Sequence, residues 1–113
     1  MLHSDGAIRA IIPDLIEMGL EILNPIQVDA NGMDPPGLKR DFGAHLVFHG
    51  AIDIQRTLPF GTPADVRAEV LDRFRVLGAD GGYVLSCSHS LLTDVPIENI
   101  VVMYRTSREE CSY

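Results

Sequence analysis

Short apolar segments alternate with helix-forming segments along this chain, and this alternation limits the fold more than any other feature. Residues 20–26, 45–52 and 82–89 are predicted to be buried strands, because each is a short apolar run bounded by Gly, Pro or polar residues. Residues 1–6 resemble the end of a fourth strand. Strands that alternate with helices are typical of βαβ units, so a parallel sheet is expected.

Capping residues and glycines predict where the helices between these strands begin and end. Three helix starts are expected where a capping side chain comes before Pro, namely at Asp34-Pro35, Thr62-Pro63 and Asp94 with Pro96. Thr62 and Asp65 also approximate a capping box. Helix ends are expected at Gly19, Gly43 and Gly78. Val66, Val70, Phe74 and Leu77 form the apolar stripe of the helix that starts at Thr62.

These elements add up to about four β–α units, the first with a truncated strand. A complete (β/α)₈ TIM barrel takes about 250 residues, whereas this chain has 113. We therefore predict an α/β fold that is half of such a barrel, with the half-barrel at residues 1–106 and a C-terminal tail at 107–113. Because a half-barrel leaves open sheet edges, we also expect the chain to form a homo-oligomer.

Composition narrows the class of partner. The formal net charge is −7, with acidic residues dispersed along the chain, and phosphate binding instead needs clustered Lys and Arg, so nucleic acid is not expected. No apolar run approaches the roughly 20 residues that cross a membrane, so no membrane partner is expected. The lack of a signal-peptide pattern and the presence of only two cysteines, Cys87 and Cys111, predict a cytoplasmic location.

Polar side chains gather at the predicted carboxyl ends of the strands, where parallel α/β proteins bind their ligands. They are His3 and Asp5, then Asn24 and Gln27, then His49, Asp53 and Gln55, and finally Cys87 and His89. We regard Asn24, Gln27, His49 and Gln55 as candidate contacts to a small-molecule substrate. By contrast, Glu69, Arg73 and Arg75 are expected on a solvated helix face, and His45 on the surface at the other end of its strand.

Several of these residues have more than one interpretation. His3, Asp5 and His89 can be ligands of a catalytic Zn²⁺ with an open coordination position, but Asp5 can equally be a helix N-cap. Asp53 can orient a substrate or form a turn. Cys87 shares a strand face with His89 and can be a further ligand, a nucleophile or a small buried side chain.

An ordered set of segments resembles the uroporphyrinogen decarboxylase superfamily. The segments are His3–Gly6, Ile12–Glu17, Ile22–Gln27, Gly32–Pro35, Leu38–Gly43, Gly50–Gln55, Leu58–Pro63 and Asp94–Asn99. The family fold is a (β/α)₈ barrel, and this chain is similar to its C-terminal half. The resemblance extends from His3 to about Tyr104.

The resemblance implies three alternative functions. Zinc-dependent methyltransferases of this superfamily work with corrinoid proteins and carry a pattern that resembles His-x-Cys with a distant Cys; here His3 matches the His, and Asp5 and His89 stand at the Cys positions. Uroporphyrinogen decarboxylases of porphyrin and haem biosynthesis need no cofactor, and His89 before Leu91–Pro96 resembles a His of that branch. A non-catalytic half-barrel that self-associates is the third alternative.

Methyl transfer is the preferred interpretation, because His3-x-Asp5 is not a decarboxylase feature. It implies zinc at His3, Asp5 and His89, a corrinoid carried by a partner protein, and an O-methyl or N-methyl substrate. His89 and Asp53 are the expected catalytic residues.

Overall fold

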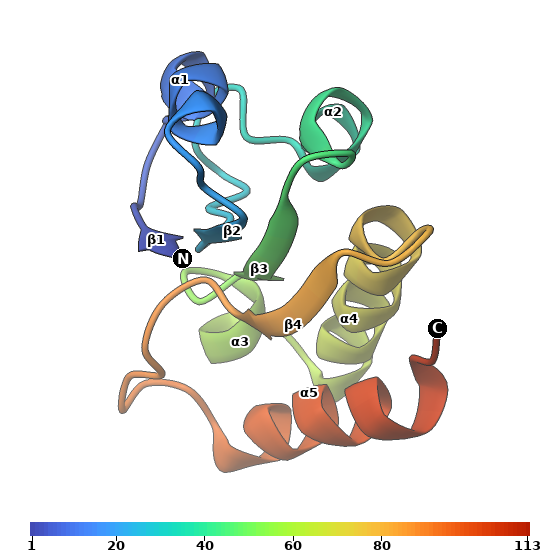
Figure 1. Ribbon diagram of the computed structural model, residues 1–113. Coiled ribbons are helices and arrows are strands. Elements are labelled where there is room, and N and C mark those ends of the chain that lie inside the picture. The colour runs from blue at the N-terminus through green and yellow to red at the C-terminus, as the bar shows by residue number, and fades with distance from the viewer.

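A parallel sheet of four strands forms the centre of the computed structural model, which describes residues 1–113 (Figure 1). The strands are β1 (Leu2–His3), β2 (Ile22–Asn24), β3 (Val47–Ile52) and β4 (Tyr83–Cys87). They lie in the order β1-β2-β3-β4, and each pairs in parallel with the next. The predicted α/β class and parallel sheet are confirmed, and each strand falls inside its predicted range.

Helices connect the strands and pack around the sheet. They are the 3₁₀ helix η1 (Arg9–Ile11) and the α-helices α1 (Ile12–Glu17), α2 (Pro35–Phe42), α3 (Thr57–Phe60), α4 (Pro63–Leu77) and α5 (Ile97–Glu110). α2 and α4 begin where the capping residues predict, since Asp34 accepts from the Gly37 N–H and Thr62 from the Asp65 N–H. Gly43 and Gly78 follow their last residues, as expected. α3 has no counterpart in the sequence prediction.

The start and end of α5 differ from expectation. Pro96, not Asp94, occupies the N-cap position, and no side chain caps this helix. A capping oxygen must sit at the N-cap itself to reach the N–H groups of the first turn, and Asp94 comes two positions too early. α5 also continues past residue 106, the predicted end of the half-barrel, to Glu110. Beyond it, the ring of Tyr113 packs 5.3 Å from that of Phe74.

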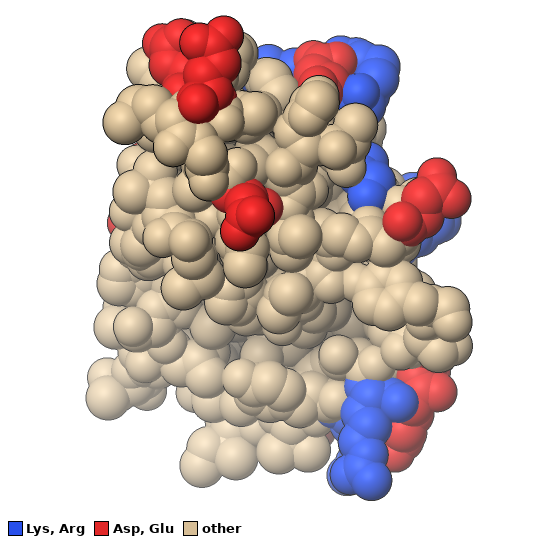
Figure 2. All heavy atoms as spheres, viewed as in Figure 1, with Lys and Arg blue, Asp and Glu red and all other residues tan.

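Two apolar clusters hold the helices against the sheet. The first joins Leu23 and Phe48 of the strands to Leu38 of α2. The second joins Ile52 of β3 to Val70 of α4 and Met103 of α5. In the view of Figure 1 the strands face the reader, and Figure 2 shows that the middle of this face carries few charged side chains. No helix combines the length and apolar character needed to cross a membrane.

The capping box of α4 predicts how stability depends on pH. The Asp65 carboxylate accepts hydrogen bonds from the backbone N–H and the hydroxyl of Thr62. Both bonds lower the pKa of Asp65 below its ordinary value, and the bond from the backbone N–H has the larger effect. A carboxylate whose pKa is lower in the folded chain stabilises the fold above its unfolded pKa of about 3.9, and this contribution is lost as pH falls through the folded value.

We therefore expect Asp65→Asn to lower the Tm at about pH 7 and to leave it near that of the wild type at about pH 2. Asp94→Asn is the matched control, because Asp94 is exposed and caps no helix. Thermal unfolding followed by circular dichroism at both pH values makes the comparison. An equal loss of Tm at both pH values in Asp65→Asn would contradict the expectation.

Candidate metal centre

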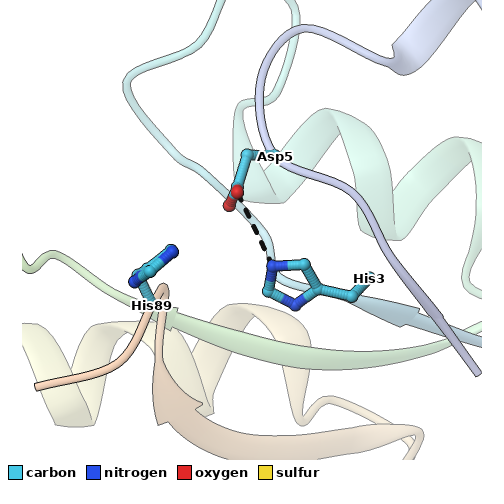
Figure 3. A group of neighbouring side chains, drawn as sticks. All are labelled: His3, Asp5 and His89. Carbon is cyan, nitrogen blue, oxygen red and sulfur yellow. Dashed lines mark ion pairs between the residues drawn. The ribbon is translucent and has the colours of Figure 1, made fainter.

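Loops that follow β1 and β4 bring three potential metal ligands together at the carboxyl edge of the sheet. His3 is the last residue of β1, Asp5 follows two residues later, and His89 lies two residues beyond the end of β4. In a parallel sheet the carboxyl ends of all strands lie along one edge, so the residues that end or follow the first and the last strand lie on the same side of the sheet. Figure 3 shows the three side chains directed toward one another.

The geometry of this group is close to that of a metal site. One ligand atom from each of His3, Asp5 and His89 lies within 4.8 Å of the other two, and all three residues are exposed. His3 Nε2 is 3.6 Å from Asp5 Oδ2. The rings of His3 and His89 are 6.1 Å apart and nearly perpendicular, at 73°.

Asp5 is not a helix N-cap, the alternative considered for it from the sequence. η1 has Ile8 at its N-cap position and α1 has Ile11, and no side chain caps either helix. Within the chain, the Asp5 carboxylate has the imidazole of His3 as its only partner. This leaves its oxygens available to an ion.

These three residues fit zinc. Ligand atoms around a tetrahedral Zn²⁺ with bonds of 2.0–2.2 Å are about 3.4 Å apart, close to the 3.6 Å between His3 and Asp5. The ligand atoms of all three residues lie within 4.8 Å of one another, and because these side chains are exposed, small side-chain movements would bring them to the distances of a zinc site. Two imidazoles and one carboxylate also match the donor types of catalytic zinc sites, which keep a fourth position open.

A cavity of about 240 Å³ adjoins this group. Its lining consists of Asp5, Gln27, Val28, Asp29, Asp53, Ile54, Gln55, Ser88 and His89. Asp5 and His89 therefore belong both to the ligand group and to the wall of the cavity. The lining contains three carboxylates and no Lys or Arg, so it favours neutral or cationic ligands over anionic ones.

Asp53 is 9% exposed and shapes one wall of the cavity. Its Oδ1 accepts hydrogen bonds from the N–H groups of Gln55, at 2.7 Å, and Arg56, at 3.3 Å. The turn-forming interpretation of Asp53 is thus what the structure shows. Oδ2 makes no hydrogen bond within the chain, which leaves one oxygen of a positioned carboxylate for a ligand in the cavity.

The predicted substrate contacts divide into two groups. Gln27 and Gln55 line the cavity, and Gln27 Oε1 also accepts from the Gly6 N–H at 2.8 Å. Asn24 and His49 do not line it. Asn24 Oδ1 instead lies 2.6 Å from His3 Nδ1, and its Nδ2 donates to the carbonyl of His49 at 3.3 Å.

Two polar residues of the cavity wall were missed from the sequence, as were the apolar Val28 and Ile54. Asp29 lies 3.6 Å from the guanidinium of Arg56, and the buried hydroxyl of Ser88 donates to the carbonyl of Ile26 at 3.0 Å. Both stand beside residues that the sequence did single out, Gln27 and His89. A search that also included the polar residues within two positions of each candidate would have found them.

Glu69 and Arg73 do not form the solvated helix face expected of them. Their side chains are 9% and 18% exposed, whereas that of Arg75 is exposed as predicted. Glu69 Oε1 accepts from the backbone N–H of Asp53 at 3.0 Å and from Arg73 at 3.3 Å, and its Oε2 is buried without a partner. Through Glu69, α4 thereby holds the backbone at Asp53, one of the residues that line the cavity.

Cys87 stays outside the ligand group. Burial raises the pKa of its thiol above the ordinary value, so the protonated form predominates at neutral pH. Because the thiolate is the nucleophile and the metal ligand, this favours the third interpretation of Cys87, a small partly buried side chain.

Comparison with known proteins identifies one family. The family model for uroporphyrinogen decarboxylase (URO-D) matches residues 1–110. No curated protein matches the chain.

Proposed function

Because the chain belongs to the uroporphyrinogen decarboxylase family, we propose that it acts in metal-dependent methyl transfer from a small O-methyl or N-methyl substrate. In this reaction the bond from the methyl carbon to oxygen or nitrogen breaks, and its electron pair stays on the heteroatom, which takes up a proton. The methyl group would pass to a nucleophile that supplies the electron pair of the new bond, either a thiolate sulfur or a reduced corrinoid held by a partner protein. Zinc, when bound, would supply a Lewis acid.

The observation that carries this proposal is that two of the three ligand residues, Asp5 and His89, also line the cavity. His3, Asp5 and His89 would hold the ion. Since Asp5 and His89 also face the cavity, a substrate there would lie beside the open coordination position. The chain's own contribution is to fix the ligands and place the reacting heteroatom next to them.

Substrate orientation is assigned to three other residues of the cavity lining, Asp53, Gln27 and Gln55. Asp53 is held by the loop N–H groups and by Glu69, so its free oxygen presents a fixed acceptor. Gln27 and Gln55 add amide groups that can donate or accept. A carboxylate and two amides suit a small polar substrate.

Uroporphyrinogen decarboxylation is the less supported alternative. A substrate with several carboxylates needs Arg residues to pair with them, and the cavity lining has none. The carboxylate of Asp53 would repel such a substrate, because no Lys or Arg pairs with it.

We further propose that the sheet is a sector of a (β/α)₈ barrel, corresponding to the C-terminal half of the family fold. Consecutive strand order supports this, because each barrel strand pairs with the next, while a doubly wound sheet reverses its order at a switch point. Association into a homo-oligomer stays a prediction.

Metal content tests the proposed function directly. Purified chain supplied with Zn²⁺ and then desalted is expected to retain near-stoichiometric zinc by plasma mass spectrometry. His3→Ala should lose it, with an affinity loss larger than the roughly 10–100-fold that removal of an outer-shell partner costs. His45→Ala is the matched control, because His45 is an exposed histidine that precedes β3 and lies outside the ligand group.

Equal zinc retention in wild type and His3→Ala would contradict the ligand assignment. If the wild-type chain retained no zinc after Zn²⁺ was added, the metal-dependent reaction would be contradicted. The decarboxylase alternative would then be the better explanation.

A further inference from the structure

We propose that Asn24 is a positioning residue that fixes the tautomer of His3, and is not a substrate contact. Asn24 ends β2, and its Cα partner across the parallel ladder is His3 at the end of β1. Its side chain lies between the imidazole of His3 and the backbone of β3. It therefore links three neighbouring strands at the edge where the ligand group lies.

The orientation of the Asn24 amide follows from its second partner. A backbone carbonyl can only accept a hydrogen bond, so the amide group that faces the carbonyl of His49 at 3.3 Å must be the NH₂. The amide oxygen is then the atom that faces His3. The oxygen and nitrogen of an Asn amide are hard to tell apart by shape, so the hydrogen bond to the backbone of β3 is what assigns them here.

The tautomer of His3 follows in turn. An amide oxygen can only accept, so His3 Nδ1, 2.6 Å away, must carry a hydrogen and donate it. In a neutral imidazole the other nitrogen is then the one with a free lone pair. That nitrogen, Nε2, lies 3.6 Å from Asp5 Oδ2 and faces the ligand group.

This arrangement is what a metal-binding histidine requires. Such a histidine usually donates its second ring N–H to an acceptor, which fixes the ring and makes the ligand more basic. Without that acceptor the ring could rotate, and a hydrogen on Nε2 would block the lone pair. Only the binding of an ion by the Nε2 lone pair rests on the proposed function. The tautomer of His3 itself does not depend on a metal.

The tautomer is tested first, on the metal-free wild-type chain. Long-range ¹H–¹⁵N correlation spectra at about pH 8, where an ordinary imidazole is neutral, distinguish an Nδ1–H from an Nε2–H ring. The chain has 4 histidines, and the His3 signals are identified by their loss in His3→Ala. We expect the Nδ1–H form for His3. An Nε2–H ring in the wild type would overturn the proposal without any variant being needed.

Variants at Asn24 then test its role in metal binding. Asn24→Leu removes the acceptor, so His3 should lose its Nδ1–H preference and zinc affinity should fall about 10–100-fold in competition with a chelator. Asn24→Asp keeps an acceptor and should restore both. Asn31→Leu, the same exchange at an exposed position, is the control and should change neither.

The outcomes separate this inference from the proposed function. Zinc binding with unchanged affinity in Asn24→Leu would overturn the positioning role and leave the metal centre intact. An Nδ1–H ring that is lost in Asn24→Leu, in a chain that binds no zinc, would support the positioning of His3 and contradict metal-dependent methyl transfer.

Discussion

Replacing Phe48 by Ala is expected to lower the free energy of unfolding by about 3–5 kcal/mol. Phe48 is fully buried in the middle of the sheet, where β3 pairs it with Leu23 of β2 and Tyr83 of β4. Its ring belongs to the apolar cluster that also contains Leu38 of α2. Truncation removes apolar contact area and leaves a cavity that the neighbouring strands cannot fill without moving.

Urea unfolding followed by circular dichroism measures this loss. Phe60→Ala is the matched control, since Phe60 is 80% exposed and its truncation should change stability by less than about 0.5 kcal/mol. The loss expected for Phe48→Ala is a substantial part of the 5–15 kcal/mol by which a typical domain is stable. Similar losses in the two variants would contradict the placement of Phe48 at the centre of the core.

Gly50→Val is expected to have the second largest effect. Gly50 has φ of +131°, and a Cβ there would lie 3.1 Å from the backbone nitrogen of Ile26 and 3.4 Å from Pro25 Cα. The backbone conformation costs a branched residue roughly 1–3 kcal/mol, and the crowding of fixed backbone atoms costs roughly another 1–3 kcal/mol. The Gly50 carbonyl also accepts from the buried hydroxyl of Tyr83, so displacement would disturb β4 as well.

Gly19→Val separates these two contributions. Gly19 also has positive φ, +94°, but a Cβ there meets nothing within 4 Å. It should therefore lose only the backbone contribution, and the difference between the two variants in urea unfolding measures the crowding. Equal losses would mean that the loop at Pro25 and Ile26 moves aside.

Local signals in the sequence predicted the sheet and both boundaries of α2 and α4. The start of α4 depends on contacts between Thr62 and Asp65, three residues apart, so the sequence alone was sufficient. α5 shows the limit of the same reasoning, because Asp94 and Pro96 looked like a helix start, while the position of the cap depends on where the chain leaves β4. α3 has only four residues and no distinct cap, and was missed.

The candidate site was predictable in its residues but not in their roles. Strand-end polarity was enough to single out His3, Asp5 and His89, which the structure brings together. It could not distinguish Gln27, which lines the cavity, from Asn24, which contacts His3, because both follow the same strand. The burial of Glu69 was equally hidden, since it depends on how α4 lies against the end of β3.

The ligand group joins the end of the first strand, at His3, to the loop after the last strand, at His89. In the unfolded chain, holding His3 near His89 would close a long loop, and the entropy lost in closing such a loop is large. An ion bound to both residues would therefore act as a long-range cross-link. Its binding free energy would add to the free energy of folding. The three side chains to which we assign the metal would then also tie the outermost strands of the sheet together.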